Sequence, residues 1–340
     1  MLSDSSVPLC EAYDLAMLDL DGVVYIGPAV VPGVPDRLAR ARDAGMRLAF
    51  VTNNAARPPA SVASHLVELG IAAEASDVVT SAQAAASLLA ARLPPGSKVF
   101  LLGGEGLDAA LRERGLEPVS RLGDDPVAVV SGYGPDLPWR RIMQGAILVR
   151  GGLPWVASNT DLTIPTDFGL GPGHGVLVRM LRDFTGVEPQ VAGKPQRPLL
   201  DETIARVGGR RPLMVGDRLD TDILGAHHAG VDSLLVMTGV THLEELVFAP
   251  ADQRPTYLAA DLEGLLRPQP APRRTHAGWT AGGWSTSVVD GVLRVDGDGG
   301  VDDWWRCVAS AAWDHVDGDG SPVRFGHLSP PVADTAGRGR

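Results

Sequence analysis

Asp19 and Asp21 are two carboxylates one residue apart, at the end of an apolar run that begins at Leu15. Ligands of parallel α/β sheets bind at the carboxyl ends of the strands, so both side chains could face one crevice. A calcium loop also begins D-x-D, but it needs Gly at its sixth and Glu at its twelfth position, where this chain has Val24 and Val30. An EF-hand is therefore excluded, and solvated Asp residues in a strand-end turn remain the alternative.

Thr52, Asn53 and Asn54 end a second apolar run, just before a predicted helix. A hydroxyl, two amides and free backbone N–H groups in such a place suit a phosphate oxygen. The alternative is structural, because Thr and Asn are also common in turns and helix caps.

Lys194 stands between Gly193 and Pro195 in a predicted turn. The segment is not a P-loop, because no Gly lies five residues before Gly193 and because Pro, rather than Ser or Thr, follows the lysine. A surface lysine in a turn is the alternative.

Asp217 and Asp222 follow Gly216 at the start of another predicted helix, after a run that ends in Met214 and Val215. Capping of the helix N-terminus by Asp is the alternative for this motif. Each motif has a structural explanation alone, but all of them fall at strand ends and in a fixed order.

That order, strand-DxDG, strand-TNN, GKP and strand-GDRxxTD, resembles the haloacid dehalogenase superfamily of phosphohydrolases. Within it, the chain is similar to the nitrophenylphosphatase-type and nucleotidase-type subfamily, which has a large cap inserted after the second motif. The likeness spans about Asp14 to Leu266. It implies an α/β fold: a Rossmann-like parallel-sheet core with an inserted α/β cap domain and a small C-terminal α+β module.

The resemblance implies a phosphomonoesterase that needs Mg²⁺ as its cofactor. Asp19 would be the nucleophile that forms an aspartyl-phosphate, and Asp21 the general acid and base. Asp19, the Asp21 backbone carbonyl and Asp217 match the family's metal ligands. Asp222 would hold a metal-bound water or orient Lys194.

The other motif residues would bind the substrate's phosphate group. Thr52, Asn53 and Lys194 would donate to its oxygens, with Asn54 beside them, and Lys194 would also hold the nucleophile ionised. A small phosphorylated metabolite is expected, with glycerol 3-phosphate as the best guess and another sugar phosphate, a nucleotide or an aryl phosphate as alternatives.

Substrate choice would belong to the cap. The polar, Gly-rich stretch at 158–165 and 171–175 is placed to fold over the core site, and it offers Asn159 and Asp161 as substrate-binding residues. His174 in the same stretch is the weaker candidate. The alternative is a long surface loop whose Asn and Asp residues form turns.

A distant alternative is an oxidoreductase that binds a nucleotide cofactor. Gly104, Gly106 and Ala109 fit G-x-G-x-x-A after a predicted strand, and Asp124 and Asp125 lie at about the distance of a ribose-binding acid. This pattern alone has little specificity.

Short apolar runs alternate with helical patterns, which is typical of a parallel α/β sheet whose two faces are covered by helices. In the core, strands are predicted at 15–20, 48–52, 213–216 and 233–237, and helices at 35–44, 60–69, 199–207 and 221–229, with Gly45, Gly70, Gly208 and Gly230 as C-caps. In the cap, strands are predicted at 99–102, 128–131 and 155–157, and helices at 82–92 and 107–114.

The domains predicted from these elements are the core at 1–79 and 186–267, the cap at 80–185, a stiff exposed linker at 268–275, a small module at 276–328 and a disordered tail at 329–340. In the module, a hairpin is expected around Asp290-Gly291 and a helix at 302–315. The module resembles acetyltransferase-like extensions of certain bacterial glycerol-3-phosphate phosphatases. It has no Gly-rich pyrophosphate loop, so acetyl transfer is not expected. Its Trp residues and the linker favour a packing or regulatory role.

The composition limits partners and location. The chain has 340 residues, with 41 Asp and Glu against 30 Lys and Arg, a formal charge of −11 and no basic run, so nucleic acid and anionic membranes are excluded as partners. Neither a targeting segment nor a membrane span is expected. Cys10 and Cys307 cannot form a disulfide framework, which favours the cytoplasm. Caps of the resembled subfamily often mediate dimers, so the resemblance implies a homodimer through the cap.

Overall fold

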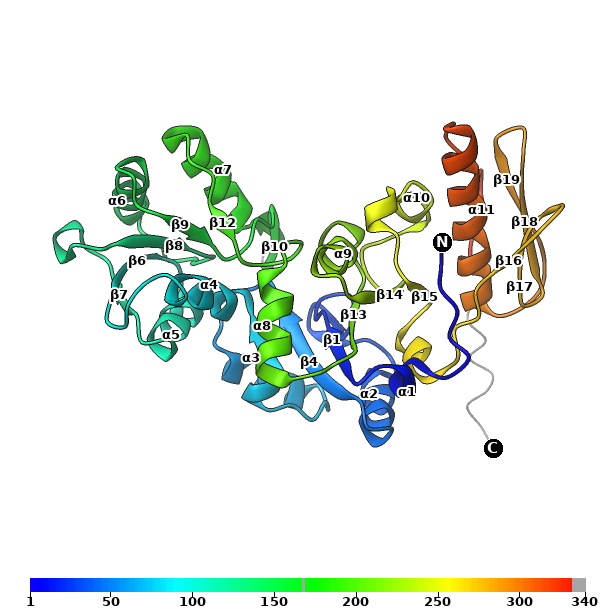
Figure 1. The fold of residues 1–340 in the computed structure, drawn as a ribbon, viewed down its shortest axis with the longest axis horizontal. Coiled ribbons are helices and arrows are strands. Elements are labelled where there is room, and N and C mark those ends of the chain that lie inside the picture. The colour runs from blue at the N-terminus through cyan, green and yellow to red at the C-terminus, as the bar shows by residue number, and fades with distance from the viewer. Residues whose placement is uncertain (167–168, 332–340) are drawn as a thin grey trace. The chain divides into compact units, whose positions relative to one another are not determined.

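The computed structural model describes residues 1–166 and 169–331 (Figure 1). They form two compact units, one from residues 1–48 with 210–331 and the other from the described part of residues 49–209. The chain passes from the first unit to the second within β4 (Arg47–Thr52).

The first unit is built on parallel strands in the order β15-β14-β13-β1. All four are almost wholly buried, as the continuous apolar runs predict. Pairing of Leu18 with Val215, and of Gly216 with Leu235, aligns the carboxyl ends of β1, β13 and β14. The strands are β1 (Leu15–Leu18), β13 (Pro212–Gly216), β14 (Asp232–Val236) and β15 (Tyr257–Ala259).

Other elements of this unit surround the strands. The predicted helix at 221–229 is divided into a π-helical turn and α9, and Asp222 in that turn accepts hydrogen bonds from the two backbone N–H groups just before it. The elements are α1 (Leu9–Ala12), β2 (Tyr25–Ile26), β3 (Ala29–Val30), α2 (Val34–Asp43), η3 (Leu219–Ile223), α9 (Leu224–Ala229), α10 (Leu243–Val247), η4 (Ala251–Gln253) and η5 (Leu262–Leu266).

The second unit contains the β4–β5 pair and a five-stranded parallel sheet in the order β12-β9-β8-β6-β7. Helices α4 and α5 lie on one face of the five-stranded sheet, and α6 and α7 lie on the other (Figure 1). The strands are β5 (Val78–Thr80), β6 (Lys98–Leu102), β7 (Glu117–Val119), β8 (Ala128–Ser131), β9 (Trp155–Ala157) and β12 (Gln190–Val191).

The helices of the second unit begin where local signals place them. Thr80 and Gln83 form a capping box at the start of α4, one residue before the predicted start. A hairpin, β10 (Thr163–Thr166) with β11 (Gly169–Pro172), leads into α7. The other elements are α3 (Pro59–Glu68), η1 (Ala75–Asp77), α4 (Ser81–Ala90), α5 (Glu105–Glu113), η2 (Leu122–Asp124), α6 (Trp139–Arg150), α7 (His174–Thr185) and α8 (Pro198–Val207).

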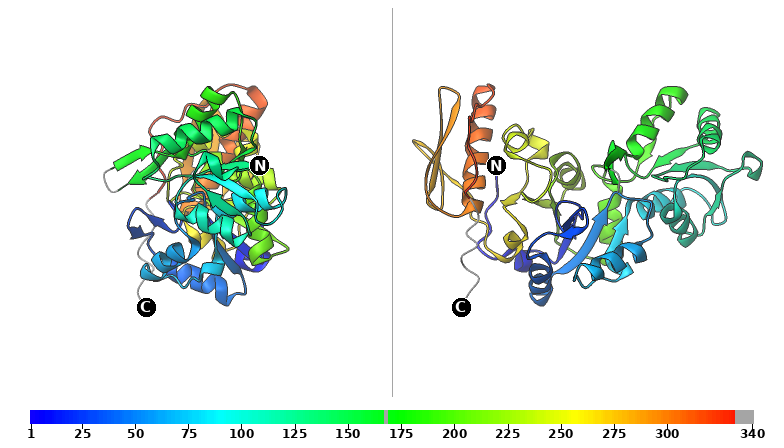
Figure 2. Two further views of the ribbon diagram at one scale, coloured as in Figure 1. Left: turned by 90° about the vertical axis from the view of Figure 1, so that its left-hand side faces the viewer. Right: turned by 180° about the vertical axis from the view of Figure 1, so that it is seen from behind.

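The C-terminal part of the first unit is an antiparallel sheet, β16-β17-β18-β19, with one long helix against it (Figure 2). The predicted hairpin turn is confirmed, with positive φ at Asp290 and Gly291. The helix is longer than the predicted 302–315. The bounds are β16 (Arg273–Thr275), β17 (Gly278–Ala281), β18 (Trp284–Val289), β19 (Val292–Gly297) and α11 (Val301–Asp319).

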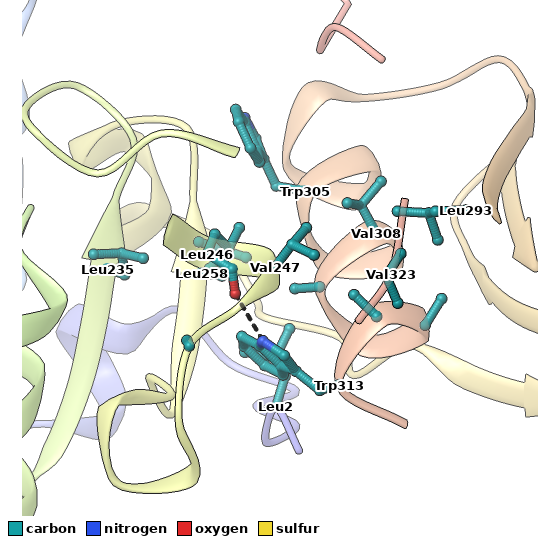
Figure 3. Close-up of a cluster of buried hydrophobic side chains, with 14 of the residues drawn as sticks. Leu2, Leu235, Leu246, Val247, Leu258, Leu293, Trp305, Val308, Trp313 and Val323 are labelled. Carbon is teal, nitrogen blue, oxygen red and sulfur yellow. Dashed lines mark hydrogen bonds between the residues drawn. The ribbon is translucent and has the colours of Figure 1, made fainter. Parts of the chain in front are cut away.

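Helix α11 is buried on two sides. Its residues share one apolar cluster with α10 and strands β14 and β15 of the same unit (Figure 3). The fully buried Trp313 adds a hydrogen bond from Nε1 to the carbonyl oxygen of Leu246 at 2.8 Å. The module is thus packed onto the unit rather than tethered to it.

The expectation of a stiff exposed linker at 268–275 is wrong in two respects. Gln269 is buried, because its amide donates to the Gly264 carbonyl and accepts from the Arg306 guanidinium. Arg273–Thr275 is strand β16, whose pairing with β17 the Pro-rich composition does not reveal. Most of the predicted tail, residues 332–340, lies outside the described residues.

Candidate active site

Three acidic side chains meet beyond the carboxyl ends of β1 and β13 in the first unit. Asp19, Asp217 and Asp222 each offer a carboxylate oxygen, and these oxygens lie within 4.8 Å of one another. Asp217 and Asp222 are fully buried, and Asp19 is half-buried. Gathering carboxylates away from water is unfavourable without a compensating positive charge. The donor set, all carboxylate oxygen, suits a hard divalent cation such as Mg²⁺.

Backbone donors fix the two buried carboxylates. Asp222 Oδ2 accepts from the backbone N–H groups of Asp217 and Arg218, at 3.2 and 3.1 Å. Asp217 Oδ2 accepts from the Val240 N–H at 2.7 Å. The side chains therefore have little freedom to move apart.

Two glycines make room for Asp217. A Cβ on Gly22 would lie 2.3 Å from Asp217 Oδ2, and one on Gly239 would lie 2.0 Å from the same atom. The Thr238 hydroxyl donates to the Gly22 carbonyl and joins the two segments. Thr238 and Gly239 were not predicted as site residues, although they follow the predicted strand at 233–237 much as the other motifs follow theirs.

Asp21 differs from these three residues in its environment. It is exposed, and its carboxylate is not among the three that converge in the described residues. Its backbone bridges to Tyr25, and the Gly22 N–H donates to the Tyr25 carbonyl at 2.8 Å. An exposed carboxylate on an ordered turn can exchange protons with solvent or a ligand.

In the second unit, Asn53 is the centre of a hydrogen-bond network at the end of β4. Its Oδ1 accepts from the Lys194 N–H at 2.8 Å, and its Nδ2 donates to the Lys194 carbonyl at 3.0 Å and to Asp161 Oδ1 at 3.1 Å. Lys194 is only 2% exposed. A Cβ on Gly193 would lie 2.5 Å from Asn53 Oδ1, so the glycine of G-K-P permits this approach.

The backbone carbonyl of Asn53 is also held. It accepts from Asn159 Nδ2 at 2.7 Å and from the Ser81 hydroxyl at 2.5 Å, while the Asp161 N–H donates to Asn159 Oδ1 at 3.1 Å. The structure thus brings together Asn53, Asn159, Asp161 and Lys194. Ser81 was not predicted, and its position directly after a strand end is the signal that could have found it.

Thr52 and Asn54 shape the turn that follows β4. The Asn54 N–H donates to Thr52 Oγ1 at 3.0 Å, and the Ala56 N–H donates to Asn54 Oδ1 at 2.9 Å. Thr52 is buried and Asn54 is half-buried. These contacts are the turn-forming type that the sequence offered as the alternative.

The Gly104–Gly106 turn does not support a dinucleotide site. The Gly106 N–H donates to the Ala56 carbonyl at 3.0 Å. A Cβ on Gly106 would lie 2.6 Å from the Ala55 carbonyl oxygen and 2.7 Å from that of Arg57. The first turn of α5 thus packs on residues 55–57, where a dinucleotide would place its pyrophosphate. This packing accounts for Gly106, and the turn gives the oxidoreductase alternative no support.

Two family models match the chain. The model described as haloacid dehalogenase-like hydrolase matches residues 16–117, and the one described as HAD-hydrolase-like matches residues 191–265. Between them they include all four motifs, from Asp19 to Asp222.

Several curated proteins are similar. The D-glycerol 3-phosphate phosphatase of Mycobacterium tuberculosis is 42% identical over 323 residues, which cover 90% of this chain and 87% of that protein. The 5'-nucleotidase of Bacillus subtilis is 34% identical over 238 residues, 69% of this chain and 91% of that protein.

Solved structures give the same picture. The glycerol phosphate phosphatase from Mycobacterium tuberculosis in complex with magnesium superposes with a TM-score of 0.84 at 41% identity and covers 95% of both chains. The 4-nitrophenylphosphatase from Thermotoga maritima has a TM-score of 0.70 at 29% identity, covering 76% of this chain and 98% of that one.

Proposed function

The chain belongs to the haloacid dehalogenase-like hydrolases, and we propose that it is a Mg²⁺-dependent phosphomonoesterase whose substrate is glycerol 3-phosphate. The observation that carries the hydrolytic activity is the buried cluster of Asp19, Asp217 and Asp222. The proposal of glycerol 3-phosphate as substrate rests on the 42% identity to the mycobacterial D-glycerol 3-phosphate phosphatase.

Asp19 is the nucleophile in this proposal. One of its carboxylate oxygens forms a bond to phosphorus while the bond from phosphorus to the ester oxygen breaks, which gives an aspartyl-phosphate and an alcohol. Asp21, exposed two residues later, gives its proton to the leaving alkoxide. It then takes a proton from the water that attacks the phosphorus, and inorganic phosphate leaves as Asp19 is restored.

The cation fits the residues present. Asp19, Asp217 and the Asp21 backbone carbonyl would hold Mg²⁺, with Asp222 holding one of its waters or orienting Lys194. When bound, the ion offsets the repulsion between the nucleophilic carboxylate and the phosphate dianion. Gly22 and Gly239 keep Asp217 in place for this role.

The second unit supplies the groups that recognise phosphate and substrate. Lys194, Thr52 and Asn54 are assigned to the phosphate oxygens together with the backbone N–H of Asn53, because both Nδ2 hydrogens of Asn53 donate to Lys194 and Asp161. Asn53 holds both the N–H and the carbonyl of Lys194, and this fixed backbone supports the assignment. A preorganised cation needs no rearrangement during the reaction. Asn159 and Asp161 are assigned to the organic part of the substrate.

The core experiment compares phosphate release by wild type, Asp19→Asn and Asp220→Asn. The substrates are glycerol 3-phosphate, a sugar phosphate, a nucleoside monophosphate and an aryl phosphate, each with Mg²⁺ and with EDTA. Asp220 is a matched control, because it is exposed in the same segment as Asp222 and pairs with Arg218. We expect Asp19→Asn to lose at least a thousandfold in kcat and Asp220→Asn to keep its activity. Wild-type turnover by Asp19→Asn contradicts the mechanism, and a better kcat/KM for another ester contradicts the substrate.

The cap domain, taken as residues 80–185 within a core of 1–79 and 186–267, is also proposed to form a homodimer. On α6, Trp139, Met143 and Ile147 are 63%, 52% and 55% exposed and recur every four residues, so they form one apolar stripe. Exposed apolar patches of this kind mark association surfaces. Trp139→Glu with Met143→Lys is expected to convert a dimer to a monomer in light scattering. A mass unchanged by the double substitution contradicts this interface.

The cytoplasm is the proposed location. Cys10 and Cys307 are both buried free thiols, which suits a reducing compartment. Within the described ranges, none of the helices has the length and apolar character needed to cross a bilayer. Fractionation of the native host tests this location. Phosphatase activity found outside the soluble cytosolic fraction would contradict it.

A further inference from the structure

His174 is a buried residue that the proposed chemistry does not use. It is the first residue of α7 and is 3% exposed. Its Nδ1 lies 2.9 Å from the backbone carbonyl oxygen of Asn159. Since a carbonyl oxygen only accepts hydrogen bonds, Nδ1 carries the proton and donates it.

The imidazole ring is neutral in this environment. Burial lowers the pKa of His174 to about 4, against the weaker opposing effect of the bond to Asn159. With the proton on Nδ1, the neutral ring has a bare lone pair on Nε2, and among residues 1–166 and 169–331 no group bonds to that atom. The tautomer therefore follows from one contact, the bond to Asn159.

The two glycines beside His174 reinforce that contact. The Gly173 N–H donates to the Leu162 carbonyl and the Gly175 N–H donates to the Asp161 carbonyl, both at 2.8 Å. A Cβ on Gly173 would lie 2.4 Å from the Asp161 carbonyl oxygen, and one on Gly175 would lie 2.1 Å from that of Thr160. The first turn of α7 thus lies directly on the loop at 159–162, and His174 adds a side-chain hydrogen bond to it.

This loop makes direct bonds to Asn53. Asn159 Nδ2 donates to the Asn53 carbonyl, and Asp161 Oδ1 accepts from Asn53 Nδ2. Asn53 in turn holds both backbone polar groups of Lys194. One chain of hydrogen bonds therefore runs from His174 through Asn159 and Asn53 to Lys194.

We propose that His174 is a positioning residue: its Nδ1–H holds Asn159, and through Asn53 sets the place of Lys194 at the phosphate. The inference rests on the phosphate-binding role proposed above for Lys194 and Asn53. It does not involve the acidic cluster, so phosphate binding is sensitive to His174 and Mg²⁺ activation is not.

The test compares His174→Leu, which removes the donor, with His174→Asn, whose Nδ2 can donate from nearly the same place as Nδ1. Loss of one hydrogen bond that positions a binding group corresponds to about a tenfold change in a binding constant. We expect His174→Leu to raise KM for glycerol 3-phosphate and Ki for inorganic phosphate about tenfold, with the Mg²⁺ concentration for half-activation unchanged. His174→Asn is expected to stay within about threefold of wild type.

A merely structural role predicts a different pattern. His174→Leu would then lower the fraction of folded enzyme, with KM and Ki unchanged. That result overturns the proposal, and so does an equal loss in His174→Leu and His174→Asn.

A second measurement is independent of activity. In ¹⁵N-histidine-labelled protein, the resonances that disappear in His174→Asn identify His174. They should show a protonated Nδ1 and an unprotonated Nε2 at pH 7. An Nε2–H tautomer overturns the inference even in an active enzyme. A wild type that hydrolyses none of the esters overturns the proposed function, while the NMR result still decides the His174 contact.

Discussion

Asn53 binds the backbone of Lys194 with both ends of its side-chain amide. Oδ1 accepts from the Lys194 N–H at 2.8 Å and Nδ2 donates to the Lys194 carbonyl at 3.0 Å, although the two residues are 141 positions apart. A side-chain amide can bind both polar groups of a peptide only when its oxygen faces the N–H and its nitrogen faces the carbonyl. The pairing therefore fixes the position of the Lys194 backbone.

Replacement of Asn53 by Asp should disrupt this pairing. The carboxylate would direct an acceptor at the Lys194 carbonyl and at Asp161, and the buried carbonyl would lose its donor. Loss of two such bonds, at about 1 to 1.5 kcal/mol each, corresponds to about a hundredfold fall in kcat/KM. Steady-state hydrolysis of glycerol 3-phosphate measures it. Thr160→Ala, an exposed change in the neighbouring loop, is the control, and activity equal to this control would show that Asn53 is dispensable.

Mg²⁺ should stabilise the protein through Asp217. At a Mg²⁺ concentration one hundred times Kd, a ligand that binds only the folded state contributes about 2.7 kcal/mol. We expect MgCl₂ to raise the melting temperature of wild type and of Asp220→Asn, and to leave that of Asp217→Asn unchanged. Differential scanning calorimetry in EDTA and in MgCl₂ makes the comparison. An equal Mg²⁺ effect in Asp217→Asn would mean that the cation binds elsewhere.

Gly22→Ala should inactivate the enzyme, whereas Gly45→Ala should not. Both glycines have positive φ, +88° and +95°, so both substitutions carry a backbone cost of about 1 to 2 kcal/mol. Only at Gly22 does the new Cβ meet the Asp217 carboxylate, because nothing lies within 4 Å of the Cβ position at Gly45. Activity per folded molecule is therefore expected to fall in Gly22→Ala and to persist in Gly45→Ala. Equal activities would argue against the tight fit at Asp217.

Stability should depend on His174 at acidic pH. The pKa of His174 falls from its usual 6.5 to about 4 on folding, so between these values the unfolded chain binds more protons. The contribution is complete above pH 6.5 and is lost as the pH falls through 4, and it amounts to about 3 kcal/mol. Denaturant titrations at pH 7 and pH 4.5 should show a smaller loss of unfolding free energy for His174→Asn than for wild type. An equal loss of unfolding free energy in wild type and His174→Asn would mean that other groups titrate in this range.

Trp313 should stabilise the first unit through the C-terminal module. Trp313→Phe removes the bond to the Leu246 carbonyl and part of a fully buried ring, with an expected loss of about 1 to 3 kcal/mol. Val67→Ala, at an exposed position of α3, is the control and is expected to change stability by less than about 0.5 kcal/mol. The denaturant midpoint measures both. An unchanged midpoint in Trp313→Phe, or unchanged stability, kinetics and mass after truncation at Pro268, would remove the packing role of the module.

Local patterns in the sequence predicted the strands and helices next to the motifs, but not helices α6 and α7 or strands β5, β7, β12 and β15. Strand Ala128–Ser131 and strand Trp155–Ala157 have the predicted bounds, and Gly45, Gly70, Gly208 and Gly230 have the positive φ expected of C-caps. These features depend on neighbours along the chain. The burial of Gln269 was not predicted, because it depends on a hydrogen bond to the distant Arg306. The division of the helix after Asp217 was also missed, although the bond from the Arg218 N–H to Asp222 spans only four residues.

The sequence by itself determined where the acidic residues fall relative to the strands. Parallel strands align their carboxyl ends, so motifs that follow β1 and β13 must reach the same edge, and the convergence of Asp19, Asp217 and Asp222 follows. Tertiary structure alone decided the environment of those groups. The space at Gly22 for Asp217, the two bonds of Asn53 to Lys194 and the contact of His174 with Asn159 join residues far apart in the chain. Such contacts are set by packing, and no spacing in the sequence encodes them.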